Sequence, residues 1–358
     1  MSEPHDPQRR LFLGTTATTI AAASLGALAS ACASSAAAQP ASAAAPATGT
    51  FTSKKRSSNT SLGTIKQVNA GLLSVGYAEL GPATGEPVIL LHGWPYDIHA
   101  YEDVAPILAS AGYRVLVPYL RGYGSTRFLS KDTFRNGQQG AVATDIVELM
   151  DALKIDKAII GGFDWGGRTG VILGALWPQR CKALVAVSGY IITNLEANKM
   201  PLPPMEELGW WYQYYFATER GRLGYDANRH DFNKLIWKLA SPKWDFDDAT
   251  FDRSAAAFDN PDHVAIVIHN YRWRLSLADG ERRYDALEQK VFEGPTIPVP
   301  TITIGSDFDG AARDGKGYAM KFVGPYSHRV LDGIGHNVPQ EAPEEFAKAI
   351  VDVAGLAR

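Results

Sequence analysis

From Ser61 onward the chain alternates short runs rich in β-branched residues with longer amphipathic segments. Parallel strands need a connection long enough to hold a helix, so this alternation is typical of a mostly parallel sheet covered by helices. The expected helices include residues 101–110, 142–153, 167–176 and 343–353. The expected strands are residues 64–69, 72–80, 88–92, 114–118, 157–161, 183–188, 301–305 and 328–331. The sequence therefore predicts an α/β fold with a mostly parallel central sheet flanked by helices.

The alternation stops between Tyr190 and Phe292, where a segment rich in Trp, Tyr and Phe shows helical spacing of its apolar residues. The expected strands resume after this segment. We therefore expect a helical cap, residues 190–295, inserted between strands 6 and 7, with the core formed by residues 60–189 and 296–358. Such an insert would lie over the strand ends, where open α/β sheets bind their ligands.

The first residues differ in composition from the rest of the chain. Arg9 and Arg10 precede a mildly apolar stretch rich in Ala, Thr, Gly and Ser, which resembles a twin-arginine export signal. We expect a signal segment at 1–38, a disordered linker at 39–59, and an exported protein that is periplasmic or secreted. The alternatives are an alanine-rich tail, an uncleaved anchor and a lipoprotein attached through Cys32. We expect contact with a membrane only through this leader or through a lipid on Cys32.

Composition restricts the class of partner. The net charge is −3 and 20% of residues are charged, with no basic stripe, so nucleic acid is not an expected partner. The sequence has no phosphate-binding loop and no dense His/Cys cluster, so neither a cofactor nor a metal is expected. If the leader is removed, Cys181 is the one remaining cysteine and no intramolecular disulfide can form. The oligomeric state is left open.

An apolar run leads into the sequence GGFDWGG, residues 161–167, and a helical pattern follows it. Small residues on both sides of Asp164 permit the sharp strand-to-helix turn called a nucleophile elbow. An ordinary capping aspartate in a glycine turn is the alternative. At the tip of an elbow, Asp164 would be an anion at neutral pH that can attack an sp³ carbon without a base, whereas a serine needs one.

The ester formed by such an attack needs a base that activates water, and an acid that orients the base. His336 lies on a loop after the last expected strand and is the candidate base. Asp309 follows the preceding strand, between Ser306 and Gly310, and is the preferred acid, with Asp307 as the alternative.

The tetrahedral intermediate of ester hydrolysis needs two backbone N–H donors. The expected donors are Trp165, which follows the nucleophile, and Trp94, in the loop His92-Gly93-Trp94-Pro95 after the third expected strand. An ordinary turn is the alternative for this loop. The Trp94–Pro95 bond is also a candidate cis peptide.

From about Ser61 to its end, the chain resembles the α/β-hydrolase superfamily, in particular its epoxide hydrolases, with haloalkane dehalogenases as near relatives. The resemblance is carried by three motifs that stand in the family's order, residues 92–95, 162–167 and 335–336. It implies the α/β-hydrolase fold and an aspartate nucleophile, Asp164, with no cofactor.

The resemblance also implies roles for two cap tyrosines, which would protonate the oxygen of an opening epoxide. Tyr212 lies in the segment WYQYYF and Tyr271 in the segment HNYR, each in the matching place. A pair of tyrosines that merely packs the aromatic cap is the alternative. Glu219-Arg220-Gly221 departs from the family, which often has a Pro-Gly step there.

The function that the resemblance implies is hydrolysis of a small apolar epoxide by water to a vicinal diol. Hydrolytic removal of halide from a haloalkane or haloacid is the alternative, because it uses the same Asp164, His336 and Asp309. A binding protein that has lost catalysis is a further alternative from another class.

Overall fold

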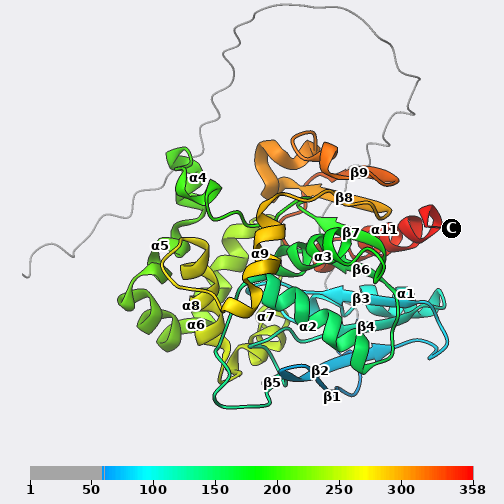
Figure 1. The fold of residues 1–358 in the computed structure, drawn as a ribbon, viewed down its shortest axis with the longest axis horizontal. Helices are drawn as coiled ribbons and strands as arrows, with labels where there is room; N and C mark the ends of the chain where they lie inside the picture. Colours follow the sequence, from blue (N-terminus) through cyan, green and yellow to red (C-terminus); the bar gives the residue numbers. More distant parts are fainter. Residues whose placement is uncertain (1–58, 60, 358) are drawn as a thin grey trace, which may run out of the picture. The chain divides into compact units, whose positions relative to one another are not determined.

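The computed structural model describes residue 59 and residues 61–357. The expected signal segment, Cys32 and the linker other than Asn59 lie outside these residues, as do the predictions of export and lipidation. In the part that is described, nine strands form one sheet in the order β1-β2-β4-β3-β6-β7-β8-β9, with β5 beside β2 (Figure 1). Their bounds are β1 Lys66–Ala70, β2 Leu73–Leu80, β3 Pro87–Leu91, β4 Arg114–Pro118, β5 Arg127–Phe128, β6 Ala158–Gly162, β7 Cys181–Val187, β8 Thr301–Ser306 and β9 Tyr326–Leu331.

The sheet is parallel from β4 through β3, β6, β7 and β8 to β9, and antiparallel where β2 pairs with β1, β4 and β5. The predicted fold class is therefore confirmed. The central strands are apolar along their whole length because they are covered on both faces, and every residue of β6 is buried. The short β5, which the sequence analysis did not predict, has two residues and no periodic pattern.

Helices cover both faces of the sheet. On β6, Gly161 faces Phe346 and Ile350 of α11, whereas the neighbouring Ile160 faces Gly170 of α3, because successive residues of a strand point to opposite sides. The bounds of the helices are α1 Val104–Ser110, α2 Gln139–Ala152, α3 Asp164–Leu176, α4 Pro204–Gly209, α5 Trp211–Ala217, α6 Glu219–Ala240, α7 Asp248–Ala255, α8 His263–Arg274, α9 Asp285–Phe292, α10 Val338–Glu341 and α11 Pro343–Leu356.

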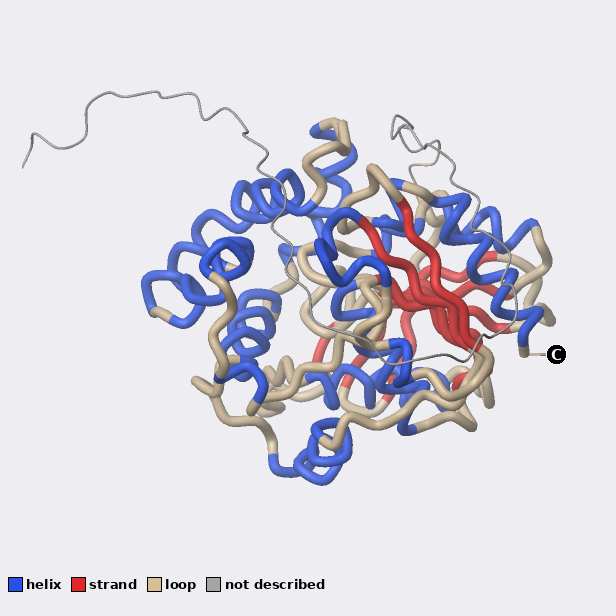
Figure 2. Tube along the Cα trace, turned by 90° about the horizontal axis from the view of Figure 1, so that it is seen from above, coloured by secondary structure: helices blue, strands red, loops and turns tan. Residues whose placement is uncertain are grey.

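The helices α4 to α9 lie in sequence between β7 and β8, and we call residues 188–300 the inserted segment. Figure 1 places α5, α6 and α8 to one side of the strands, and Figure 2 shows from above a group of helices beside the sheet. Aromatic side chains pack this segment, and the rings of Phe216, Tyr225 and Phe232 lie within 5.3 Å of one another. In the described residues, no helix is both long enough and apolar enough to cross a membrane.

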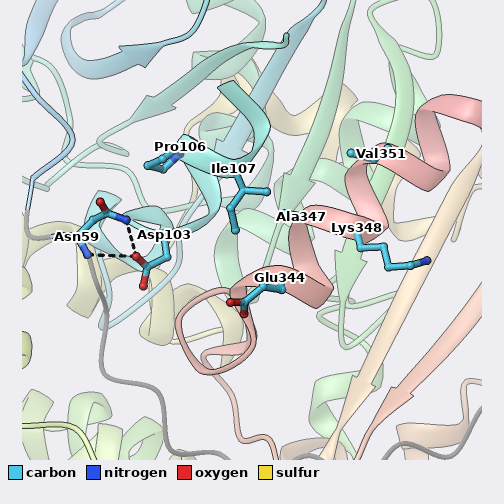
Figure 3. A pocket seen from close by; sticks show the side chains of 8 residues that line it. All are labelled: Asn59, Asp103, Pro106, Ile107, Glu344, Ala347, Lys348 and Val351. Carbon is cyan, nitrogen blue, oxygen red and sulfur yellow. Dashed lines mark hydrogen bonds between the residues drawn. The ribbon is translucent and has the colours of Figure 1, made fainter. Parts of the chain in front are cut away.

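A hollow of about 470 Å³ lies between α1 and α11 (Figure 3). Asp103 accepts hydrogen bonds there from the backbone and side-chain nitrogens of Asn59, at 3.2 and 2.6 Å. The other lining residues are Pro106, Ile107, Glu344, Ala347, Lys348 and Val351. None of the residues that the sequence predicts to be catalytic lines this hollow.

Glu288 ties the inserted segment to the core. Its carboxylate, on α9, accepts hydrogen bonds from the backbone N–H of Gly140 at 2.9 Å and from the side chain of Gln139 at 3.1 Å, both in the first turn of α2. The residue is 4% exposed. Burial raises the pKa of Glu288 to about 7, although these two donors act to lower it. A buried carboxyl group therefore titrates at the contact between α9 and α2.

Glu288→Gln should reduce the pH dependence of stability. The pKa of Glu288 is higher in the folded chain than in the unfolded one, so the folded state holds this proton more tightly. The stabilisation is present below the unfolded pKa and is lost as pH rises through about 7. Urea unfolding should show the wild type losing about 3 kcal/mol relative to the variant between acidic pH and about pH 8. The exposed Glu293→Gln is the control, and equal slopes for both variants would refute the assignment.

Candidate active site

Three loops that follow parallel strands meet at the carboxyl edge of the sheet. Leu91 of β3 is in register with Gly162 of β6, so the loop after β3 and the turn after β6 start side by side. The loop after β9 carries His336 to the same place. Neighbouring parallel strands end at one edge, so residues far apart in the chain come together there.

Asp164 has a left-handed backbone conformation, with φ of +51°. This conformation costs a residue with a side chain about 1–3 kcal/mol, and it is retained where the surroundings enforce it. A Cβ on Gly166 would lie 1.9 Å from the carbonyl oxygen of Leu91, and a Cβ on Gly93 would lie 2.3 Å from Oδ1 of Asp164. Glycine at both positions lets the two loops approach closely. The helix α3 starts directly at Asp164, three residues earlier than the sequence predicts, because the turn leads straight into it.

The carboxylate of Asp164 is held by one of the two predicted backbone donors. The N–H of Trp94 donates to Oδ1 at 2.7 Å. Oδ2 lies 3.5 Å from Nε2 of His336. Burial acts to raise the pKa of Asp164, but His336, the positive charge of Arg168 and the N–H of Trp165 outweigh it, so the pKa lies below the ordinary value. Asp164 is therefore an anion at neutral pH.

The loop of His336 is fixed by one buried carboxylate. Glu341 accepts hydrogen bonds from the backbone N–H groups of Gly335 at 2.7 Å and Asn337 at 3.0 Å, and from the hydroxyl of Ser241 at 2.6 Å. The same Ser241 oxygen accepts from the N–H of His336 at 3.0 Å. Ser241 directly follows α6, so the inserted segment takes part directly in holding the histidine loop.

The two candidate acids do not contact the histidine. Asp309 accepts a hydrogen bond from the N–H of Ser306 at 2.8 Å, and Asp307 accepts from Lys243 at 2.6 Å. The ring of Phe308, which lies between them in sequence, packs against the imidazole of His336 with centroids 4.1 Å apart. Among the described residues, Nδ1 of His336 is buried and has no hydrogen-bond partner. The structure thus brings Asp164 and His336 together but does not bring Asp309 to them.

The predicted cap tyrosines lie next to each other, on α5 and α8. The rings of Tyr212 and Tyr271 are perpendicular, with centroids 5.3 Å apart, and each lies about 5 Å from the indole of Trp94. Burial raises the pKa of both hydroxyls, and the negative charge of Asp164 acts in the same direction. Both tyrosines therefore keep their protons at neutral pH.

The two indoles beside Asp164 differ in what they can offer a ligand. Nε1 of Trp94 donates to the hydroxyl of Tyr225 at 2.9 Å, and this hydroxyl also contacts Nε2 of His263 at 2.8 Å. Nε1 of Trp165 is buried and has no partner among the described residues. Trp165 therefore has a free donor, whereas the indole of Trp94 is already bound to the inserted segment.

A cavity of about 340 Å³ opens over Asp164 and His336. Met205 and Leu208 of α4 line it and are 76% and 61% exposed, so the cavity reaches the surface at α4. The other lining residues are Trp94, Gly209, Trp211, Tyr212, Ile236, Leu239, Ala240 and Phe308. The lining is mostly apolar and also includes the polar side chains of Asp164, Tyr212 and His336, as in many small-molecule sites.

The site contains groups that the sequence analysis missed. Glu341 and Ser241 hold the histidine loop across about a hundred residues of sequence, and no local pattern marks such a contact. Arg168 lies four residues after Asp164 on one helix, and this spacing could have been noticed. Within the described residues, no three His, Cys, Asp or Glu side chains gather in a way that could hold a metal ion.

Comparison with known proteins places this geometry in a family. Residues 86–224 match the sequence family described as alpha/beta hydrolase fold. The chain is 31% identical over 337 residues to epoxide hydrolase B of Mycobacterium tuberculosis, covering 76% of this chain and 92% of that protein. It is 33% identical over 288 residues to a haloalkane dehalogenase of Psychrobacter cryohalolentis, covering 78% and 86%. The crystal structure of a "putative epoxide hydrolase" from Klebsiella pneumoniae is 57% identical with a TM-score of 0.81, covering 82% and 98%.

Glu341→Ala should destabilise the chain, because it leaves the buried N–H groups of Gly335 and Asn337 without an acceptor. An unsatisfied buried donor costs about 1–3 kcal/mol, so we expect a loss of about 3 kcal/mol in the free energy of unfolding. Urea denaturation measures it. Glu206→Ala, at an exposed carboxylate, is the matched control and should change stability by less than about 0.5 kcal/mol. Equal effects of the two substitutions would contradict the role of Glu341.

Proposed function

The chain belongs to the α/β-hydrolase family and is an epoxide-hydrolase-like hydrolase, and we propose that it opens an epoxide to a vicinal diol through an ester on Asp164. One observation carries this proposal. An ionised, buried carboxylate lies on a left-handed turn, with one oxygen on a backbone N–H and the other 3.5 Å from an imidazole. A carboxylate in this position suits attack on an sp³ carbon with a leaving group.

In the first step, Oδ2 of Asp164 attacks an epoxide carbon, and the carbon–oxygen bond of the ring breaks. The electron pair goes to the oxygen, which takes a proton from a tyrosine hydroxyl. Tyr212 lines the cavity and contacts Tyr271, and both hydroxyls keep their protons at neutral pH. Developing alkoxide charge is thereby neutralised as it forms.

In the second step, His336 takes a proton from water, and the hydroxide attacks the ester carbonyl of Asp164. The N–H of Trp94 already donates to this carboxylate, and the N–H of Trp165 directly follows the nucleophile in the first turn of α3, so the two suit stabilisation of the oxyanion. Collapse releases the diol and restores the carboxylate, and the proton taken up by His336 passes through solvent to the tyrosinate left by the first step, so that every group returns to its starting state. Asp309 is the proposed acid behind His336, and this role requires its carboxylate to turn from Ser306 toward Nδ1.

Hydrolysis of a carbon–halogen bond is the second candidate. The free Nε1 of Trp165 favours it, because a buried, unpaired N–H donor can hold a departing halide. The similarity to a haloalkane dehalogenase points the same way. The indole of Trp94 is bound to Tyr225, which leaves a halide one indole donor at this place rather than two.

His336→Gln should form the ester on Asp164 but hydrolyse it slowly, because no base remains to activate water. Mass spectrometry of the intact variant after exposure to styrene oxide should show a gain equal to the whole epoxide. Exposure to 1-bromobutane tests the second candidate, for which the gain is the alkyl group with loss of bromide.

The control is the double variant that combines His336→Gln with Asp164→Asn, because it removes the carboxylate that would carry the ester. An adduct that persists in the double variant would exclude Asp164 as the nucleophile. If 1-bromobutane gives an adduct and styrene oxide gives none, the epoxide reaction is wrong and hydrolysis of a carbon–halogen bond is the function instead.

Tyr212→Phe and Tyr271→Phe should each slow ring opening about tenfold or more, because a developing alkoxide loses a proton donor. Stopped-flow tryptophan fluorescence on the His336→Gln background isolates this step, since ester hydrolysis is already blocked there. Tyr214→Phe, at an exposed tyrosine of the same helix α5, is the control. Unchanged ring-opening rates in both active-site variants would assign the tyrosines to packing alone.

A further inference from the structure

The ring of Phe308 lies against one face of the imidazole of His336. The centroids of the two rings are 4.1 Å apart, and their planes differ by 37°. Two rings that lay side by side in one plane would be farther apart, so the faces of these rings overlap. Tyr96 and Phe163 also border the imidazole, but at 5.8 and 6.0 Å and with interplanar angles of 56° and 67°. Among the described residues, Phe308 is therefore the aromatic ring in closest contact with His336.

The ring of Phe308 is held from two sides. The N–H of the preceding Asp307 donates to the carbonyl of Ile334 at 2.9 Å, which fixes this segment to the loop of His336. On the other side, the ring meets Trp210, between α4 and α5, edge to face with centroids 5.9 Å apart. Phe308 also lines the cavity over the nucleophile. The ring is thus fixed between the histidine loop and the inserted segment.

The hydrolytic step places a positive charge on this imidazole. When Nε2 of His336 takes a proton from water and the hydroxide adds to the ester carbonyl, the ring becomes an imidazolium. The carboxylate of Asp164, 3.5 Å from Nε2 in the free chain, has by then become an ester and lost its charge. Nδ1 has no hydrogen-bond partner among the described residues, and Asp309 is bound to Ser306. In this arrangement the imidazolium forms without a carboxylate at either nitrogen.

We propose that the ring of Phe308 stabilises the imidazolium of His336 and thereby speeds hydrolysis of the ester on Asp164. A cation over the face of an aromatic ring is attracted by its π electrons, and the attraction is larger where water is excluded. A neutral imidazole gains less, so the ring favours the charged form that the step requires. Phe308 acts through His336 and is a positioning residue. This inference rests on the proposed function for the ester, and it holds for an epoxide and for a haloalkane alike.

Packing alone predicts a different dependence on the ring. A side chain that only fills the space beside His336 acts through its volume, and another apolar group of similar size would serve. Attraction between the imidazolium and the π electrons depends on the electron density of the ring. Ring fluorines withdraw this density and change the size of the side chain little. Fluorination of Phe308 therefore separates the two roles.

The test replaces Phe308 of the full chain by phenylalanines that carry one, two and three ring fluorines. Stopped-flow tryptophan fluorescence with excess enzyme resolves ester formation from ester hydrolysis, with styrene oxide and with 1-bromobutane as substrates. Hydrolysis should slow with each fluorine, to about a tenth of the wild-type rate with three, whereas ester formation should change less than twofold. The same fluorines on Phe292, which ends α9 and does not line the cavity, are the control and should leave both rates unchanged.

Two ordinary substitutions test the same contact. Phe308→Leu keeps an apolar side chain without π electrons and should slow ester hydrolysis about tenfold. Phe308→Tyr keeps the aromatic ring and should hydrolyse the ester within about threefold of the wild-type rate. A leucine variant as fast as the wild type would overturn the proposal, as would a hydrolysis rate that stays constant across the fluorinated series.

An NMR titration of the free chain tests the inference without turnover. The Cε1–H signal of His336 reports the imidazolium directly, and its midpoint should move to lower pH with each fluorine on Phe308, because the cation loses stabilisation. The ionisable groups that face His336 or flank Phe308 are the same throughout the series, namely Asp164, Glu341, Tyr96, Tyr212, Asp307 and Asp309.

The two measurements separate this inference from the proposed function. A midpoint that moves with fluorination, without ester formation from either substrate, would keep the stabilised imidazolium and refute the proposed function. Ester formation followed by hydrolysis that ignores the fluorines would keep the proposed function and overturn the role of Phe308. A midpoint that stays constant without ester formation would overturn both.

Discussion

The arrangement of the site depends on the close contact between the turn at Asp164 and the loop after β3. Gly166 allows the turn to lie against the carbonyl of Leu91, and Gly93 allows the loop to lie against the carboxylate. The N–H of Trp94 can then reach Oδ1 at 2.7 Å. A left-handed aspartate is costly by itself, and it is kept here because the two glycines and the backbone donor leave little room for another conformation.

A second set of contacts joins the inserted segment to the histidine loop. Ser241 and Glu341 form one hydrogen-bonded group around the backbone of residues 335–337. The imidazole is thus positioned by its backbone and by the ring of Phe308, and not by a bond to Nδ1. Packing on the remaining sides of the ring therefore positions Nε2, the nitrogen that faces Asp164.

The sequence was sufficient for the sheet, for the turn at Asp164 and for the position of His336 beside it, because each has a local signature. Apolar runs predicted the central strands, glycines around Asp164 predicted the sharp turn, and chain order predicted that His336 would reach it. The Trp94–Pro95 bond is cis, as the motif indicated. The position of Asp309 could not be predicted, because its loop can satisfy a carboxylate locally through Ser306. Contacts such as Glu341 with Ser241 depend on the packing of distant segments and carry no local pattern.

The bond between the Trp94 indole and Tyr225 bears on how molecules enter and leave the cavity. Together with the contact of Ser241 with the histidine loop, it fastens the inserted segment to the core on both sides of Asp164. Opening the inserted segment as a hinged lid would break these buried bonds. The cavity already reaches the surface at the exposed side chains of Met205 and Leu208, so a small molecule has a way in that leaves these bonds intact.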